Sequence, residues 1–123
     1  MTVKRWPTIP RTIEGLAGPI RVVVRRGVES FKAKDGDDCL GLYQPVKRRI
    51  DIAGKVPPAL RWHTLIHEWT HSVLLDCGAV NLIHGVGIEH ERNVEVFSDT
   101  FATALLRAGV QQFGVDPWEN YKR

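Results

Sequence analysis

The chain has 123 residues, of which 43% are hydrophobic, 25% charged and 8% aromatic, with a net charge of +3. This composition excludes a disordered or collagen-like chain, and the length fits one domain, so we expect residues 1–123 to form a single domain. Apolar runs are short, so we expect no transmembrane helix, no signal peptide and a cytoplasmic protein. Acidic residues are mixed with the basic ones, so nucleic acid is not an expected partner.

The first half of the chain has the pattern of short strands separated by turns. Proline and glycine are frequent in residues 1–19, where we expect at most a helical turn around residues 12–16. β-branched residues alternate with arginine over residues 20–28, which predicts a strand, and a second short strand is expected over residues 39–44. The alternation of polar and apolar residues over 48–53 predicts a third, half-buried strand.

The second half predicts two helices joined by a glycine-rich connection. Pro57 and Pro58 suit the first turn of a helix, so we expect a largely buried helix over residues 58–76 that stops at Gly78. A second helix is predicted over residues 89–108, followed by an irregular tail. Its expected core face consists of apolar residues at helical spacing: Val94, Phe97, Phe101, Ala104, Leu105 and Ala108. The predicted fold class is α+β, with an antiparallel or mixed sheet of about three strands packed on two helices.

The segment His67-Glu68-Trp69-Thr70-His71 carries the clearest chemical signal. Two histidines four residues apart on a helix lie on one face, where a single zinc ion can accept a nitrogen from each. Glu68 is turned about 100° away from His67, so it is placed to act as a base toward a water rather than as a ligand. A catalytic zinc ion still needs a third protein ligand and an open position.

The predicted second helix carries three carboxylates that can supply the third ligand. Glu91, Glu95 and Asp99 follow at four-residue steps and share one face, where their mutual repulsion favours a nearby cation. We expect Glu95 to be the ligand and Asp99 to accept a hydrogen bond from a ligand histidine. The alternative places Glu91 on the metal and Glu95 behind it.

The HExxH segment together with Glu95 and the residues that follow it resembles the ImmA/IrrE family of small zinc metallopeptidases. That family pairs HExxH with a glutamate on a later helix, in a segment reading roughly E-x-x-A-[ND]-x-F-A-x-x-L-L. Asp99, Phe101, Ala102, Leu105 and Leu106 fit this pattern, and Ser98 replaces the usual alanine. The resemblance selects Glu95 over Glu91. It extends from about residue 40 to residue 106 and implies a minimal zincin fold of the thermolysin-like, gluzincin type.

The resemblance implies a phage or mobile-element endopeptidase that holds one Zn²⁺ through His67, His71 and Glu95 and cuts a regulatory protein such as a repressor. Glu68 is then the catalytic base, and an edge strand over residues 49–53 is expected to hold the extended substrate. If phage-encoded, the protein works in the cytoplasm of a bacterial host. Two alternatives are a zinc-binding anti-repressor without proteolysis and a DNA-associated protease, which requires a clustered basic face.

Four further residues are candidates to stabilise an oxyanion beside the zinc, namely His63, His84, His90 and Tyr43. The sequence does not choose between them. The two cysteines, Cys39 and Cys77, are too few for a secreted disulfide scaffold and are expected to be small, partly buried residues.

Overall fold

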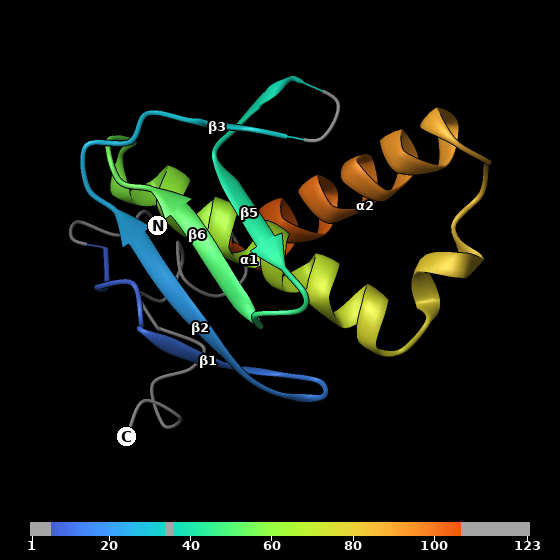
Figure 1. The fold of residues 1–123 in the computed structure, drawn as a ribbon, viewed down its shortest axis with the longest axis horizontal. Helices are drawn as coiled ribbons and strands as arrows, with labels where there is room; N and C mark the ends of the chain where they lie inside the picture. Colours follow the sequence, from blue (N-terminus) through green and yellow to red (C-terminus); the bar gives the residue numbers. More distant parts are fainter. Residues whose placement is uncertain (1–5, 34–35, 107–123) are drawn as a thin grey trace.

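Four strands form a mixed sheet in the computed structural model, which describes residues 6–33 and 36–106 (Figure 1). In spatial order they are β1 (Thr12–Gly15), β2 (Gly18–Arg25), β6 (Arg49–Ala53) and β5 (Gly41–Gln44). β2 runs parallel to β6, whereas the β1–β2 and β5–β6 pairs are antiparallel. Two very short strands, β3 (Phe31–Lys32) and β4 (Asp38–Cys39), pair separately. The α+β class is confirmed, with one strand more in the main sheet than predicted.

The additional strand is β1, where the sequence predicted at most a helical turn. That prediction was wrong because residues 12–15 pair with β2 as a hairpin, with Gly18 adopting a φ of +129° at its turn. Ile13 lies opposite Ile20, and both side chains are fully buried. Burial of this pair stabilises the hairpin against α1, an interaction that a short window of sequence does not contain.

The strand over residues 49–53 is not at the edge of the sheet, contrary to expectation. β6 lies between β2 and β5, and four of its five residues are buried. β5 is therefore the edge strand on that side. The sequence alternation of β6 is that of a half-buried strand, but its outward-facing Asp51 is covered by Arg25, Arg49 and Gln44, all within hydrogen-bond distance of its carboxylate.

Within the described residues the chain forms two α-helices, α1 (Pro58–Asp76) and α2 (Ile88–Leu106), and a short 3₁₀ helix, η1 (Ala79–Leu82). The predicted bounds of α1 are confirmed, with proline in its first turn and Gly78 at a φ of +75° after its end. α2 begins one residue before the predicted position. Its predicted end at Ala108, and the predicted tail over residues 111–123, lie outside the described residues.

The side of α2 that faces α1 differs from the predicted core face. Its buried residues recur at four-residue steps: Val94, Ser98, Ala102 and Leu106. Val94 is buried as predicted. Phe97, Phe101, Ala104 and Leu105 are instead exposed, so their assignment to the core was wrong. Ser98 and Ala102 have small side chains that let the two helix axes approach closely, and a bulky residue in their place would hold α2 away from α1.

The hydrophobic core lies between the inner face of the sheet and the helices. Isoleucines of β1, β2 and β6 pack on Trp62, Leu65 and Ile66 of α1, and the C-terminal half of α2 closes the cluster. In Figure 1, α1 passes behind the sheet, and α2 lies beside α1 and extends beyond β5. This arrangement places the middle of α1 between the edge strand β5 and α2.

No helix in the described part of the chain is long and apolar enough to cross a membrane. Cys39 and Cys77 are not joined to each other by a disulfide. Cys39 is partly buried, as expected, whereas Cys77 is exposed just after α1.

Candidate metal centre

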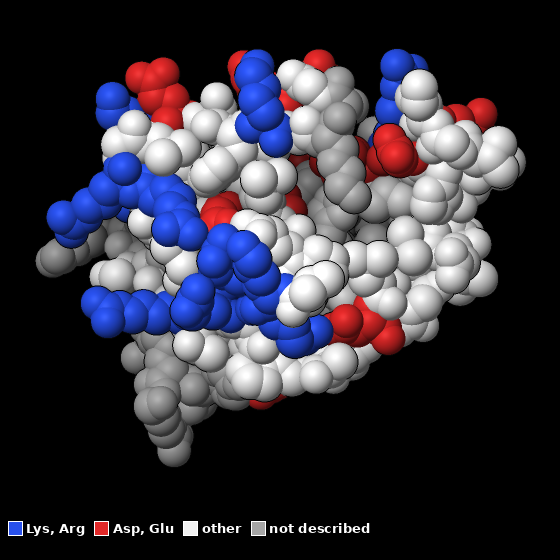
Figure 2. Space-filling model, in the orientation of Figure 1, with Lys and Arg blue, Asp and Glu red and all other residues white. Residues whose placement is uncertain are grey.

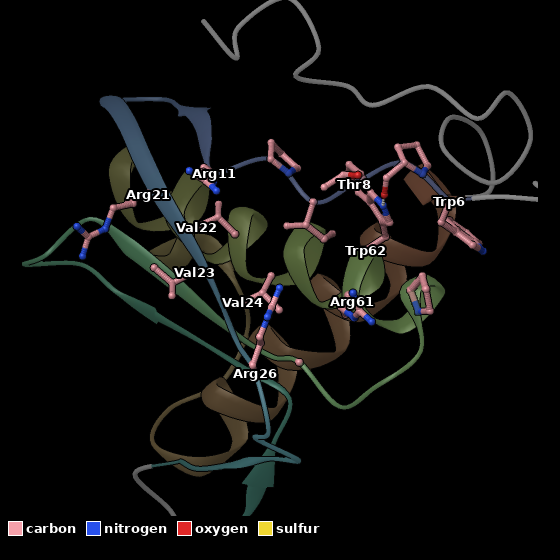
Figure 3. A pocket seen from close by; sticks show the side chains of 15 residues that line it. Trp6, Thr8, Arg11, Arg21, Val22, Val23, Val24, Arg26, Arg61 and Trp62 are labelled. Carbon is pink, nitrogen blue, oxygen red and sulfur yellow. Dashed lines mark hydrogen bonds between the residues drawn. The ribbon is translucent and has the colours of Figure 1, made fainter.

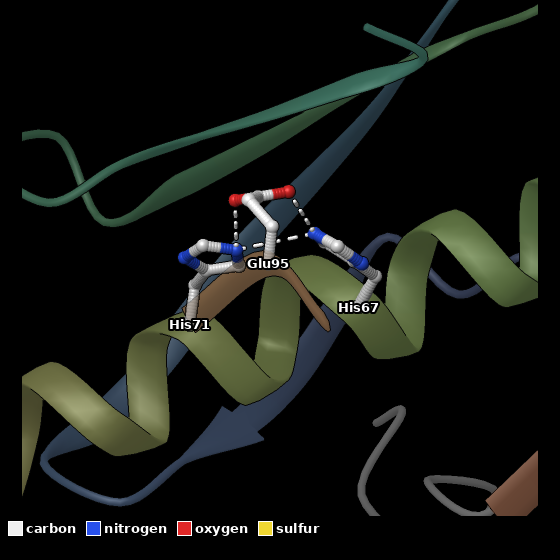
Figure 4. Close-up of side chains that lie close together, drawn as sticks. All are labelled: His67, His71 and Glu95. Atoms are coloured by element: carbon white, nitrogen blue, oxygen red, sulfur yellow. Dashed lines mark hydrogen bonds and ion pairs between the residues drawn. The ribbon is translucent and has the colours of Figure 1, made fainter. Parts of the chain in front are cut away.

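His67 and His71 of α1 and Glu95 of α2 point their side chains at a common position (Figure 4). The helical step of four residues places the two imidazoles on one face, with ring centroids 4.9 Å apart. The burial of Val94 and Ser98 rotates α2 so that Glu95, on the adjoining face, meets them. The structure therefore brings together the three residues that the sequence predicted as ligands.

Distances within this group fit a compact tetrahedral metal ion. Nε2 of His67 lies 3.1 Å from Nε2 of His71, and the two carboxylate oxygens of Glu95 lie 3.0 Å and 2.8 Å from these nitrogens. One donor atom from each residue can be chosen so that all lie within 4.8 Å of one another. Ligands at about 2.1 Å from a tetrahedral zinc ion are separated by about 3.4 Å, so the three side chains need only small shifts to hold one.

Asp99 takes the position predicted for it, behind a ligand histidine. Its Oδ1 lies 2.7 Å from Nδ1 of His67, and as a carboxylate it accepts the proton of that nitrogen. This contact fixes the orientation of the ring and leaves Nε2 directed at the centre. Asp99 and Glu95, two carboxylates one helical turn apart on α2, thus contact different nitrogens of His67.

The carboxylates around His67 determine its charge in the metal-free protein. Burial by itself would lower the pKa of His67, but the hydrogen bond to Glu95 and the charges of Glu68, Glu95 and Asp99 together raise it to about 9. The hydrogen bonds from His67 and His71 hold the pKa of Glu95 far below its usual range. His67 is therefore a cation without metal, and its proton occupies a place where a metal ion can bind.

Glu68 lies beside the centre but is held apart from it. Its Oε1 accepts a hydrogen bond of 3.0 Å from the backbone N–H of Tyr43 on β5, and its Oε2 is 3.7 Å from Nε2 of His67. Burial raises the pKa of Glu68 to about 7, against the lowering effect of the two histidines. A buried carboxylate with a pKa near neutrality can both take up and release a proton.

Gly41 allows β5 to approach this part of α1. The sequence patterns of metal ligands and bases did not predict this close approach. A Cβ atom at position 41 would lie 2.5 Å from Cγ2 of Thr64 and 3.3 Å from Cγ of Glu68. Only glycine fits without displacing the strand. The available signal was a glycine inside a strand pattern, which often marks a close backbone approach.

The remaining candidates lie outside the ligand group. Glu91 is exposed and is not part of it. His63 lies one turn before His67 on α1, and its Nε2 is 3.1 Å from the Thr103 hydroxyl oxygen. His90 contacts the carbonyl of Val80, and His84 is exposed with Glu89 as its neighbour.

Tyr43, the fourth oxyanion candidate, packs against the core cluster, and burial raises the pKa of its hydroxyl. Its contact with the centre is made by its backbone instead.

The centre is open to solvent on the side of α2. The His67 side chain is only 10% exposed, whereas Glu95 is 58% and Asp99 63% exposed. The two histidines are thus more enclosed than the carboxylates of α2. No protein-family model, curated protein or solved structure matches the chain significantly.

Proposed function

We propose that this protein is a zinc-dependent endopeptidase with a minimal zincin fold, of the ImmA/IrrE type. The observation that carries the proposal is the convergence of His67, His71 and Glu95, with Glu68 buried next to them. Two imidazoles and one carboxylate are the ligand set of catalytic zinc sites, which keep a fourth position open. A purely structural zinc site would have no need of the adjacent base.

His67, His71 and Glu95 would hold a zinc ion, whose Lewis acidity would polarise the scissile carbonyl and make a water molecule easier to deprotonate. Glu68 accepts the proton of the attacking water and passes it to the leaving amine. The Tyr43 N–H holds one oxygen of Glu68 in place, so that the other oxygen remains directed toward the ligands. Asp99 keeps His67 in the orientation that binding requires.

An extended substrate is best placed along β5. Ala53 donates to the carbonyl of Leu40, so the alternation of an antiparallel pair directs the peptide groups of Gly41 and Tyr43 away from β6. The Tyr43 N–H is used by Glu68, so a peptide strand added at this edge would pair with the peptide groups of Gly41 and the carbonyl of Tyr43 and would run past Glu68 and the ligand group. By the resemblance to the ImmA/IrrE family, the substrate is a regulatory protein such as a repressor, in the cytoplasm of a bacterial host.

The first test combines metal content with proteolysis. The zinc-loaded protein is incubated with a library of peptides from digested bacterial protein, and new termini are identified by mass spectrometry. We expect one zinc ion per chain and cleavage that a chelator abolishes. Zinc binding with no cleavage of peptides or of intact bacterial protein would favour an anti-repressor that captures its target without cutting it.

Replacing Glu68 separates the base from the metal ligands. We expect Glu68→Gln to retain one zinc ion per chain and to lose cleavage by about 10²-fold or more, because general-base catalysis contributes on that scale. Glu91→Gln is the matched control, since it makes the same change at an exposed position. Full activity of zinc-loaded Glu68→Gln would overturn the proposed mechanism.

A further inference from the structure

A groove separates the N-terminal segment from β2, at the start of α1 (Figure 3). It has a volume of about 800 Å³, and its lining shares no residue with the metal centre. One wall is the segment 6–11, which is tied to α1 because the indole N–H of Trp62 donates to the carbonyl of Pro7. The opposite wall is β2.

The β2 side of the groove presents an unused strand edge. Backbone pairing between β2 and the N-terminal segment ends at Val22, whose N–H donates to the carbonyl of Arg11. The next hydrogen-bonded pair of this antiparallel ladder would join Ile9 to Val24, but these two residues form no backbone hydrogen bond. Along β2, Val24 has the same orientation as Val22, so its N–H and C=O face the groove, and they have no backbone partner among the described residues. A peptide strand can therefore pair here.

Four arginines surround the groove, and no Asp or Glu lines it among the residues that the structure describes. Arg11 and Arg21 lie at one end, and Arg26 and Arg61 at the other (Figure 3). None of the four makes an ion pair within the described part of the chain. Arg25 and Arg49, the neighbouring basic residues of the sheet, are ion-paired instead, because both contact the buried carboxylate of Asp51.

The outer face of the sheet is also basic. Figure 2 shows lysine and arginine side chains gathered over β2 and β6 on the outer face of the sheet. Charge on this face repels cationic partners and favours an anion.

We infer that this groove binds an extended acidic segment of a partner protein, added as a strand to β2. Arg21 and Arg26 are five residues apart, or roughly 16 Å along a strand. Carboxylates at both ends of a segment of about seven residues can therefore meet both pairs of arginines. The apolar floor, formed by Trp6, Ile9, Val24 and Trp62, suits short apolar side chains between them.

A peptide fits the groove better than a nucleic acid does. Single-stranded nucleic acids bind through aromatic side chains on which bases stack. Trp62 is fully buried, and its indole N–H is already used, so among the described residues of the lining Trp6 is the one partly exposed aromatic side chain. The free peptide group of Val24, in contrast, offers pairing to a backbone.

Fluorescence anisotropy with a labelled peptide, Glu-Glu-Val-Thr-Val-Glu-Glu, tests the inference on the full chain. We expect saturable binding that weakens with salt, and no binding of Lys-Lys-Val-Thr-Val-Lys-Lys. Arg26→Glu and Arg61→Glu should each weaken binding by about tenfold or more. Lys47→Glu is the matched control, because Lys47 is exposed in the turn between β5 and β6, outside the groove, and this change should leave binding within about twofold.

Amide hydrogen exchange tests the mode of binding, and we expect the exchange of the Val24 amide to slow when the acidic peptide is bound. Equal loss of binding in Lys47→Glu and Arg26→Glu, or an unchanged Val24 amide at saturation, would overturn the inference. So would tighter binding of a seven-nucleotide single strand than of the acidic peptide. Circular dichroism shows that each variant is folded. These results are independent of whether the metal centre cleaves peptides.

Discussion

Individual side chains around the centre have their protonation set by burial and by neighbouring charges. His67 illustrates this, because carboxylates approach both of its nitrogens, Asp99 at Nδ1 and Glu95 at Nε2. A ring in that position keeps its proton until a metal ion replaces it. The metal and the proton therefore compete for the same nitrogen.

Zinc affinity should accordingly depend on pH above the range in which an ordinary histidine titrates. The metal-free pKa of His67 is raised to about 9, so the proton competes with zinc at every pH below that value. We expect the apparent association constant to rise by roughly tenfold per pH unit between pH 7 and 8.5. An unperturbed histidine, with a pKa near 6.5, would give a nearly flat response there. Competition with a chromophoric chelator measures this, and a flat response would contradict it.

Ser98 is a second residue whose surroundings decide its contribution to the stability of the fold. It is fully buried on α2, and its hydroxyl oxygen has no hydrogen-bond partner among the described residues. A buried hydroxyl without a partner costs about 1–3 kcal/mol, although its removal also leaves a small void.

We therefore expect Ser98→Ala to raise the free energy of unfolding by about 1 kcal/mol, measured by urea denaturation of the metal-free protein. Thr103→Val is a useful comparison, since that hydroxyl does have partners, His63 Nε2 and the carbonyl of Asp99, and its loss should destabilise. A loss of stability in Ser98→Ala would show that the hydroxyl is satisfied in solution.

The packing of β5 against α1 positions Glu68 beside the metal centre. The strand approaches the helix closely at Gly41, and this approach brings the Tyr43 N–H to Glu68. The contact is a property of two packed elements and not of either alone.

We expect Gly41→Ala to push β5 away from α1 and to release Glu68. Its new Cβ would meet Thr64 at 2.5 Å, a distance that cannot be accommodated without movement. Cleavage should fall by about tenfold or more while zinc content stays at one per chain, since the ligands come from α1 and α2. The double variant Gly41→Ala with Thr64→Ser removes the clashing methyl group and should restore part of the activity. Wild-type activity in Gly41→Ala alone would refute this role.

Across the whole molecule, a metal ion would join the two helices. Two ligands belong to α1 and one to α2, and the glycine-containing connection of residues 77–87 links them in sequence. An ion that binds only the folded chain stabilises it by mass action.

Zinc removal should therefore lower the melting temperature. At a free zinc concentration 100 times the Kd, the stabilisation is about 2.7 kcal/mol. In a chain of this size that corresponds to several degrees in differential scanning calorimetry. Glu95→Gln should abolish most of the zinc-dependent shift, and Glu91→Gln should keep it. An equal loss in both variants would mean that Glu95 is not the ligand that joins the helices.

The sequence determined those features that depend on local spacing. A four-residue step on a helix is enough to place His67 beside His71, and proline and glycine at its ends are enough to bound α1. The class of fold followed in the same way from short alternating segments ahead of two helical ones. The position of Glu95 needed a relation between two helices, which the family pattern supplied.

Tertiary structure decided what depends on contacts between distant segments. β1 formed because Ile13 is buried against β2 and α1, β6 became internal because β2 pairs with it, and Phe97 stayed exposed because Ser98 and Ala102 face α1 instead. The close approach at Gly41 and the free edge of β2 likewise depend on contacts between segments that are distant in sequence. Each depends on which surfaces are buried together, and the free energy of that burial is a property of the packed whole rather than of any local run of residues.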